Sequence, residues 1–238
     1  MLIWFILMLL GAYLLGSFPT AYLVARWRRG IDVRRYGSGN VGAANVLALI
    51  SKRWSIVVTV FDIGKGVLTV WIAQLLGLGA AQQATAGIFT VIGHNWPVFL
   101  KFKGGRGIFT TLGVVTMLSP KLGLLILVLP YLLAPLRQVS LGVFIALVSM
   151  PVFSWFLSGP LSIEARLPIT MGLVTLTLIA LSKRLLAPRT LLSESVSKVE
   201  LFVNRLFFDR DIRDRQVWIR QTRVDVHSVE QHPEQDEA

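Results

Sequence analysis

A glycine-rich segment at residues 37–45 has residue types whose spacing suits the binding of an anion. Closely spaced glycines let several backbone N–H groups turn toward one point and approach it closely. Ser38 and Asn40 add side-chain donors, and Arg34 and Arg35 directly upstream add positive charge. This combination predicts a phosphate cradle made without a metal. An ordinary glycine turn that leads into a helix is the alternative.

A second segment, residues 93–107, combines glycines with basic and polar side chains. Three glycines surround Arg106, whose planar guanidinium can hold a phosphate through two parallel hydrogen bonds. His94 and Asn95 are expected at the membrane edge, about two helical turns before this basic loop. The structural alternatives are a hydrogen-bonded core histidine and, for the two lysines of the loop, a role in setting membrane topology.

Asp62 and Lys65 place two charges inside an otherwise apolar stretch. Charged side chains within a membrane span are costly and are usually functional or paired. Residues three apart share one face of a helix, so these two side chains can meet. They could neutralise each other as a structural pair, or Asp62 could orient Lys65 toward a bound phosphate.

The composition is that of a membrane protein. The chain has 238 residues, of which 54% are hydrophobic and 16% charged, and its mean hydropathy is +0.64. Ordinary globular chains have about a quarter charged residues. Cysteine is absent, which excludes disulfides, thiolate metal sites and a thiol nucleophile. Two of the three histidines lie in a polar tail, so we expect no metal site and no cofactor.

Positive charge is concentrated in the apolar part of the chain. Residues 1–186 hold 16 Lys and Arg but 3 Asp and Glu, whereas residues 187–238 hold 8 and 10. A basic membrane domain indicates anionic partners, either lipid headgroups or phosphorylated substrates. Nucleic acid is not expected, because these charges lie in short loops between apolar spans.

The apolar runs predict an all-α polytopic bundle of about seven spans. Loops rich in Lys and Arg, at residues 26–53 and after residue 100, are assigned to the cytoplasm, with the N-terminus outside and the C-terminus inside. Residues 108–136 form either one kinked helix or two short ones, and charge parity favours two. A span of 11 residues would have to be re-entrant or buried by neighbours. The predicted spans are residues 2–25, 54–76, 84–100, 108–118, 122–136, 139–157 and 167–181.

The chain divides into a membrane domain, residues 1–186, and a cytoplasmic tail, residues 187–238. Ser197 and Glu200 match a capping box, and Val199, Phe202, Val203 and Leu206 follow at helical spacing. This pattern predicts an amphipathic helix that lies on the membrane surface or packs on its own protein. Beyond His227 the composition is polar and acidic, which predicts disorder.

Residues 37–45, 62–66 and 93–107 resemble, in order and spacing, the membrane-integral glycerol-3-phosphate acyltransferases that use acyl phosphate as donor. The resemblance runs to about residue 186. It implies a seven-helix fold in the cell membrane, of the bacterial inner-membrane type, with its motifs facing the cytoplasm. It also implies transfer of a fatty acyl group from acyl phosphate to the 1-hydroxyl of sn-glycerol 3-phosphate, with neither coenzyme A nor metal. The partners implied are acyl phosphate, glycerol 3-phosphate and membrane lipids.

The resemblance also assigns site residues. Ser38, Gly39 and Asn40 would hold the acyl phosphate, Lys65 would lie beside the phosphates, and the glycines around Arg106 would shape the glycerol-phosphate pocket. The implied catalytic residues are Ser38, Asn40, Lys65 and Arg106. The implied substrate-binding residues are Gly37, Gly39, Gly42, Asn45, Asp62, His94, Asn95, Lys103, Gly104, Gly105 and Gly107.

The chain departs from the family pattern at four places. Ala44 and Ala48 replace a threonine and an arginine, Arg106 replaces a lysine, and residues 177–181 lack an Arg-His-x-x-Asn segment. These departures leave two alternatives to an active enzyme: a non-catalytic paralogue that binds phospholipid or acyl phosphate, and a small transporter lined by Asp62, Lys65 and His94. The glycine cradles favour phosphate chemistry over transport.

Overall fold

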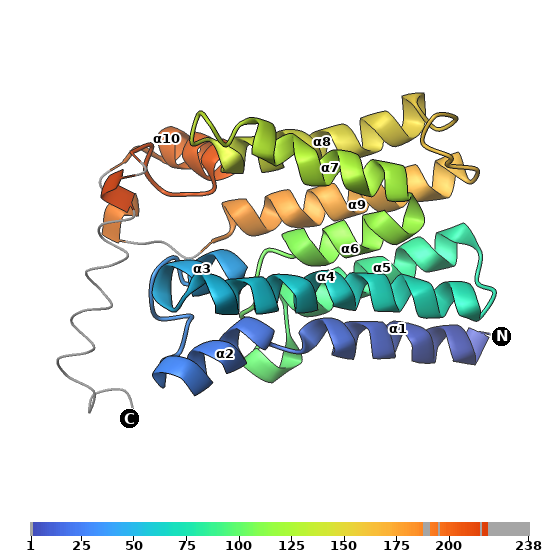
Figure 1. Ribbon diagram of the computed structural model, residues 1–238, viewed down its shortest axis with the longest axis horizontal. Coiled ribbons are helices and arrows are strands. Elements are labelled where there is room, and N and C mark those ends of the chain that lie inside the picture. The colour runs from blue at the N-terminus through green and yellow to red at the C-terminus, as the bar shows by residue number, and fades with distance from the viewer. Residues whose placement is uncertain (1, 188–190, 195, 215, 219–238) are drawn as a thin grey trace.

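The computed structural model describes residues 2–187, 191–194, 196–214 and 216–218, and throughout these ranges the chain is helical or irregular, with no strand. The long helices run side by side in one bundle (Figure 1). The start of α1 lies at one end, and α2 (Thr20–Arg29), α3 (Ala43–Leu49) and α10 (Lys198–Val203) lie at the other, which we call the site end. An all-helical bundle of apolar helices confirms the predicted fold class, while the number of crossings and their orientation stay predictions.

The first predicted span is broken into two helices, α1 (Leu2–Ser17) and α2 (Thr20–Arg29). The predicted span of residues 2–25 lies within one apolar segment, Leu2–Arg29, whose helix is interrupted at Phe18 and Pro19. Pro19 has no backbone N–H, and its ring collides with the carbonyl four residues earlier, so a helix cannot pass through it undisturbed. The break leaves the Phe18 carbonyl free of the regular helical pattern.

The loop after α2 contains a short helix, α3 (Ala43–Leu49), and then α4 (Lys52–Leu75) crosses the bundle. The next helix, α5 (Ala80–Asn95), ends before a single helical turn at Val98–Leu100. The predicted span of residues 84–100 was therefore too long at its C-terminal end. Trp96 precedes Pro97, and a residue before proline is pushed out of the helical conformation, so α5 ends with His94 and Asn95 on its last turn.

Two separate helices occupy residues 108–136, as charge parity indicated: α6 (Ile108–Leu118) and α7 (Pro120–Leu132). Ser119 caps α7 by accepting a hydrogen bond from the Leu122 amide at 3.4 Å, and Pro120 suits the first helical position. The remaining long helices are α8 (Val139–Phe156) and α9 (Arg166–Leu185). Because α9 extends past residue 181, Lys183 and Arg184 lie on its last turn and not in a loop.

Within the part of the chain that the structure describes, four helical segments are long and apolar enough to cross a membrane: Leu2–Arg29, Lys52–Leu75, Val139–Phe156 and Arg166–Leu185. Large apolar side chains such as Trp4, Val60 and Phe156 are exposed on their outer faces, where lipid would cover them. Inside, one apolar cluster around Leu122 and Leu173 joins α5 to α9. A second cluster around Val33, Val46 and Val58 packs the loop after α2 onto α4 at the site end.

The tail returns to the site end as α10 (Lys198–Val203) followed by a π-helical turn (Asn204–Phe208). Ser197 accepts a hydrogen bond from the Glu200 amide at 3.2 Å, as expected of the predicted cap. Val199 and Phe202 are exposed while Leu201 is buried, so the short helix has both a packed face and an open apolar one. The predicted disorder beyond His227 lies outside the described residues.

Candidate active site

The two glycine-rich loops touch each other at the site end. The Gly105 amide donates a hydrogen bond to the His94 carbonyl at 3.1 Å, and a Cβ at Gly105 would collide with His94 Nε2 and with the carbonyl oxygen of Val41. A glycine is therefore required where the second loop passes over the first. Arg34 adds a second link by donating to the Leu100 carbonyl at 3.1 Å.

Asn45 holds the first glycine loop in shape. Its Nδ2 donates to the carbonyls of Val33 at 3.1 Å and Tyr36 at 3.0 Å, and its Oδ1 accepts from the Ser38 amide at 3.2 Å. Gly37 has a φ of +63° and lies so close to Asn45 Oδ1 that a Cβ would clash. The Asn45 amide, predicted to bind substrate, is thus engaged with the loop backbone.

The predicted contacts of the first loop lie on one half-buried turn. Ser38, Gly39 and Asn40 follow one another there, and the Asn40 amide donates to Ser38 Oγ at a long 3.4 Å. Gly42 then begins α3 as its N-cap. The segment predicted as a phosphate cradle is therefore also a glycine turn that leads into a helix, so both interpretations of the sequence apply to the same residues.

Arg34 is matched by an acid of its own loop. Its guanidinium donates to Asp32 at 2.6–3.1 Å, and the Asp32 Oδ1 also accepts from the Arg34 amide at 3.0 Å. Partial burial raises the pKa of Asp32, but the hydrogen bonds and charge of Arg34 outweigh it, so that the pKa lies below its ordinary value. Arg34 thus fastens the loops together, and its charge is neutralised.

Asp62, Lys65 and His94 form a buried polar cluster beneath the loops. Lys65 Nζ donates to Asp62 Oδ1 at 2.9 Å and to the Phe18 carbonyl at 2.7 Å, and His94 Nδ1 lies 3.5 Å from the same carboxylate oxygen. The acid and the lysine are 3% and 5% exposed. Both charges are satisfied by partners on α4 and α5 and at the break between α1 and α2, and the other ring nitrogen of His94 faces Gly105.

The second loop brings further polar groups to the same place. Asn95 is fully buried, and neither of its amide atoms has a hydrogen-bond partner among the described residues. Its backbone carbonyl accepts from Lys183 Nζ at 2.9 Å, and that ammonium also lies 5.0 Å from the centre of the Trp96 ring. Gly107 ends the loop against the Asn95 side chain, and Lys103 is exposed at the loop surface.

Arg106 has a partner that the sequence did not predict. One of its guanidinium nitrogens donates to the carboxylate of Asp209, which belongs to the tail. Arg184 Nε, on α9, lies 3.9 Å from the other oxygen of that carboxylate. Arg106 is within electrostatic range of both Lys183 and Arg184. Lys183, Arg184 and Asp209 were all missed, because lysine and arginine at a helix end indicate topology as readily as function.

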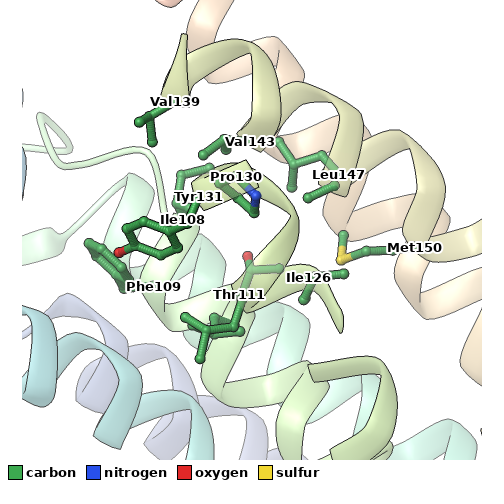
Figure 2. Close-up of a pocket in the computed structure, with 13 residues that line it drawn as sticks. Ile108, Phe109, Thr111, Ile126, Pro130, Tyr131, Val139, Val143, Leu147 and Met150 are labelled. Atoms are coloured by element: carbon green, nitrogen blue, oxygen red, sulfur yellow. The ribbon is translucent and has the colours of Figure 1, made fainter. Parts of the chain in front are cut away.

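An apolar cavity of about 110 Å³ begins where the second loop ends (Figure 2). Ile108 and Phe109, which directly follow Gly107, line it together with side chains from α6, α7 and α8. Phe109 also packs on the apolar cluster of the first loop. The buried hydroxyl of Thr111 has no hydrogen-bond partner among the described residues. The remaining lining residues are Leu112, Ile126, Leu127, Pro130, Tyr131, Val139, Val143, Ala146, Leu147 and Met150.

The fold and the site define a polytopic helical membrane protein with a cationic, glycine-lined centre at one end of its bundle. A family model described as glycerol-3-phosphate acyltransferase matches residues 6–189, so the chain belongs to that family. It is 44% identical over 170 residues to glycerol-3-phosphate acyltransferase 5 of Dehalococcoides mccartyi, covering 71% of this chain and 73% of the relative.

Solved structures of PlsY, an integral membrane glycerol 3-phosphate acyltransferase, have the same fold. The glycerol 3-phosphate form matches with a TM-score of 0.68 and 31% identity, covering 76% of this chain and 88% of that one. The lysophosphatidic acid form matches with a TM-score of 0.67 and 28% identity, covering 91% and 98%. The family match stops at residue 189, so the segment that carries Asp209 lies outside it.

Proposed function

We propose that this protein transfers a fatty acyl group from an acyl phosphate to the 1-hydroxyl of sn-glycerol 3-phosphate in phospholipid synthesis. The observation that carries the proposal is the contact of Gly105 with the Val41 carbonyl, which brings two glycine cradles side by side. A reaction between two phosphorylated substrates needs two neighbouring anion sites. Membership of the glycerol-3-phosphate acyltransferase family supports the same reaction.

Each cradle takes one substrate. Ser38, Gly39 and Asn40 hold the acyl phosphate, with Gly37 and Gly42 at the ends of the turn. Gly104, Gly105 and Gly107 shape the glycerol-phosphate pocket, and Arg106 and Lys103 supply its positive charge. Catalysis then rests on placing the two substrates in contact and on stabilising the charge that develops as they react.

The chemistry requires no cofactor because the donor is already activated. The 1-hydroxyl oxygen attacks the acyl carbonyl carbon, and the bond between that carbon and the phosphate oxygen breaks. The products are 1-acylglycerol 3-phosphate and inorganic phosphate, and the departing phosphate accepts the hydroxyl proton. No base from the protein is needed for the balance of this step.

The buried cluster supports the cradles from below. Asp62 and Phe18 hold Lys65, and Asp62 holds the His94 ring, whose second nitrogen faces Gly105. His94 thereby supports the second loop at the point where the loops cross. The unpartnered amide of Asn95 supplies a buried donor and acceptor for the glycerol hydroxyls.

The apolar cavity between α6, α7 and α8 takes the acyl chain (Figure 2). Ile108 and Phe109 line the cavity and directly follow the second loop, and Phe109 packs on the apolar cluster of the first loop, so a donor bound by its phosphate can lay its chain among the helices. Burying each methylene contributes about 0.8 kcal/mol. The site end then faces the cytoplasm of a bacterial inner membrane, as the basic loops predict.

The test is turnover by the purified protein in lipid nanodiscs, supplied with palmitoyl phosphate and glycerol 3-phosphate. We expect phosphate release that depends on glycerol 3-phosphate and is matched by 1-acylglycerol 3-phosphate. Ser38→Ala should abolish release, and Ser158→Ala, in the loop at the opposite end, should leave it unchanged. Release that persists in Ser38→Ala would contradict the assignment of the first cradle.

A non-catalytic paralogue is the second outcome of this experiment. Ala44 and Ala48 lie exposed on α3, so methyl groups stand where relatives would present a hydroxyl and a guanidinium. Binding of both substrates without turnover, in protein that remains folded, would identify the chain as a binding paralogue. The transporter alternative has no support in the structure, because Asp62, Lys65 and His94 are engaged with one another.

A further inference from the structure

The segment beyond the family domain is fastened to the end of α9 by hydrogen bonds from Arg205 and Arg184, and a buried ion pair holds Arg205 in place. Arg205 Nε donates to Asp211 Oδ1 at 2.7 Å, and Arg205 also donates to the carbonyls of Leu185 at 3.0 Å and Ala187 at 2.7 Å. Arg184 adds a bond to the Leu206 carbonyl at 3.0 Å. These contacts hold the chain between Arg205 and Asp211 as a fixed turn.

Asp209 lies on that turn and points back into the site. Its backbone is left-handed, with φ of 59° and ψ of 39°, a conformation that non-glycine residues seldom adopt. One carboxylate oxygen accepts from Arg106 and the other faces Arg184 Nε at 3.9 Å. Asp209, which lies outside the family domain, is thus ion-paired with Arg106 of the second glycine loop.

No acidic residue of the membrane domain lies close to the cationic group formed by Arg106, Lys183 and Arg184. The three acids of that domain are Asp32, Asp62 and Glu164. Asp32 pairs with Arg34 and Asp62 with Lys65, while Glu164 lies in the loop between α8 and α9 at the opposite end. Arg106 and Arg184 therefore receive their counter-charge from the tail, and Lys183 lies within electrostatic range of Arg106.

The Asp209 carboxylate leaves part of the hydrogen-bonding capacity of these cations unused. Arg184 is 1% exposed, and its Nε has no hydrogen-bond partner among the described residues; neither has Asp209 Oδ1. A carboxylate carries one charge and two oxygens, whereas a phosphate ester carries nearly two charges and three free oxygens. A phosphate would meet the three cations better than Asp209 does.

We propose that Asp209 is a tethered competitor of the substrate phosphate, which holds Arg106 in the resting protein and is displaced when glycerol 3-phosphate binds. This inference rests on the proposed assignment of the second loop to glycerol 3-phosphate. A site that is open for only part of the time has an apparent Kd equal to its intrinsic Kd divided by the fraction of time that it is open. Removing the carboxylate therefore strengthens binding, although it removes a polar contact.

The experiment compares the full-length wild type with Asp209→Asn and Asp214→Asn in nanodiscs, by calorimetric titration with glycerol 3-phosphate and separately with inorganic phosphate. Asp214→Asn is the matched control, because it removes the same charge from the tail. Asp214 does not contact Arg106 but accepts hydrogen bonds from the amides of Gln216 and Val217. We expect Asp209→Asn to bind about tenfold more tightly and Asp214→Asn to bind as the wild type does. Equal or weaker binding by Asp209→Asn overturns the proposal.

A second measurement follows the turn itself. The chain has no cysteine, so spin labels can be placed cleanly at Arg213→Cys on the tail and Leu47→Cys on α3, both exposed positions. Glycerol 3-phosphate should change the distance between the labels, and Asp209→Asn should show the changed distance without ligand. A distance that never changes overturns displacement.

The two proposals fail in different ways. Turnover with an unchanged Kd in Asp209→Asn refutes the competitor and leaves the acyltransferase. Tighter binding and a released tail, without turnover in any variant, supports the competitor and refutes acyl transfer. A wild type and an Asp209→Asn variant that both bind neither anion refute both.

Discussion

The Phe18 carbonyl accepts a hydrogen bond from Lys65 Nζ at 2.7 Å, across 47 residues of sequence. Pro19 makes this contact available, because it breaks the helix and releases that carbonyl from the regular pattern. The same ammonium is held by Asp62, so one lysine joins the broken first span to α4. The carbonyl released by the break in the first span and the buried ammonium of Lys65 would each be costly without a partner, and each is the hydrogen-bond partner of the other.

Removing Lys65 should therefore destabilise the protein more than removing the whole pair. Lys65→Met leaves the Asp62 carboxylate buried without its main counter-ion, which typically costs about 3–5 kcal/mol. The double variant Asp62→Asn, Lys65→Met should recover much of that loss. Unfolding in detergent is the measurement, with exposed Lys101→Met as a control expected to change stability by less than about 0.5 kcal/mol. A double variant no more stable than the single one would contradict this account.

Gly105→Ala should disable the site while the bundle still folds. The new Cβ would collide with His94 Nε2 and the Val41 carbonyl, and the loops would have to separate. A misplacement of about 1 Å can lower a rate by about a hundredfold, so we expect a loss of that order in phosphate release. Gly11→Ala on α1, where a Cβ meets open space, is the matched control and should be fully active. Normal turnover by Gly105→Ala would show that the close approach of the loops is not needed.

The Asp32–Arg34 pair should stabilise the first loop in a pH-dependent way. The pKa of folded Asp32 lies below its ordinary value, which is about 3.9 in the unfolded chain. The carboxylate therefore stabilises the fold above the unfolded pKa, and this contribution is lost as the pH falls through the lower, folded pKa. The difference in unfolding free energy between wild type and Asp32→Asn should be positive at pH 7 and should shrink below about pH 4. A difference independent of pH would rule out this role.

Filling the apolar cavity should shift the preference of the protein toward donors with a shorter acyl chain. Ala146 is buried on α8 and lines the cavity, so Ala146→Phe removes space that a long chain would use. We expect kcat/KM to fall for palmitoyl phosphate and to change little for a donor of about half that length, since each lost methylene contact costs about 0.8 kcal/mol. Val148→Phe places the same side chain on the exposed face of the same helix and serves as the control. Equal losses for both donors would place the acyl chain elsewhere.

Local patterns predicted much of the fold. The Ser119-Pro120 step separated α6 from α7, and the apolar run after residue 139 matched α8 within a residue. The ends of α1 and α5 were wrong, because prolines interrupt apolar runs that hydropathy alone treats as continuous. Pro19 is a visible signal that could have placed the first break.

The spacing of Asp62 and Lys65 predicted that the two side chains could pair, whereas the long-range contacts of the loops were not predicted. Gly105 and Arg106 stood out in the sequence by their residue types. The close approach of Gly105 to the Val41 carbonyl and the contact of Arg106 with Asp209, 103 residues away, have no local sequence signature. Asn45 was predicted to bind substrate, and in the structure its amide is hydrogen-bonded to the backbone of its own loop. An amide side chain serves either purpose with the same donors and acceptor, and its surroundings decide between them.

By itself, the amino-acid sequence determined that this is a helical membrane protein with two glycine-rich basic loops and the motifs of its family. Hydropathy, helical period and glycine spacing act over a few residues, so they can be interpreted in linear order. Only the tertiary structure decided that the loops touch, that Lys65 closes the break at Pro19, and that the tail places Asp209 on Arg106. Those contacts depend on which helices pack together, and the chain folds them from residues that are far apart in sequence.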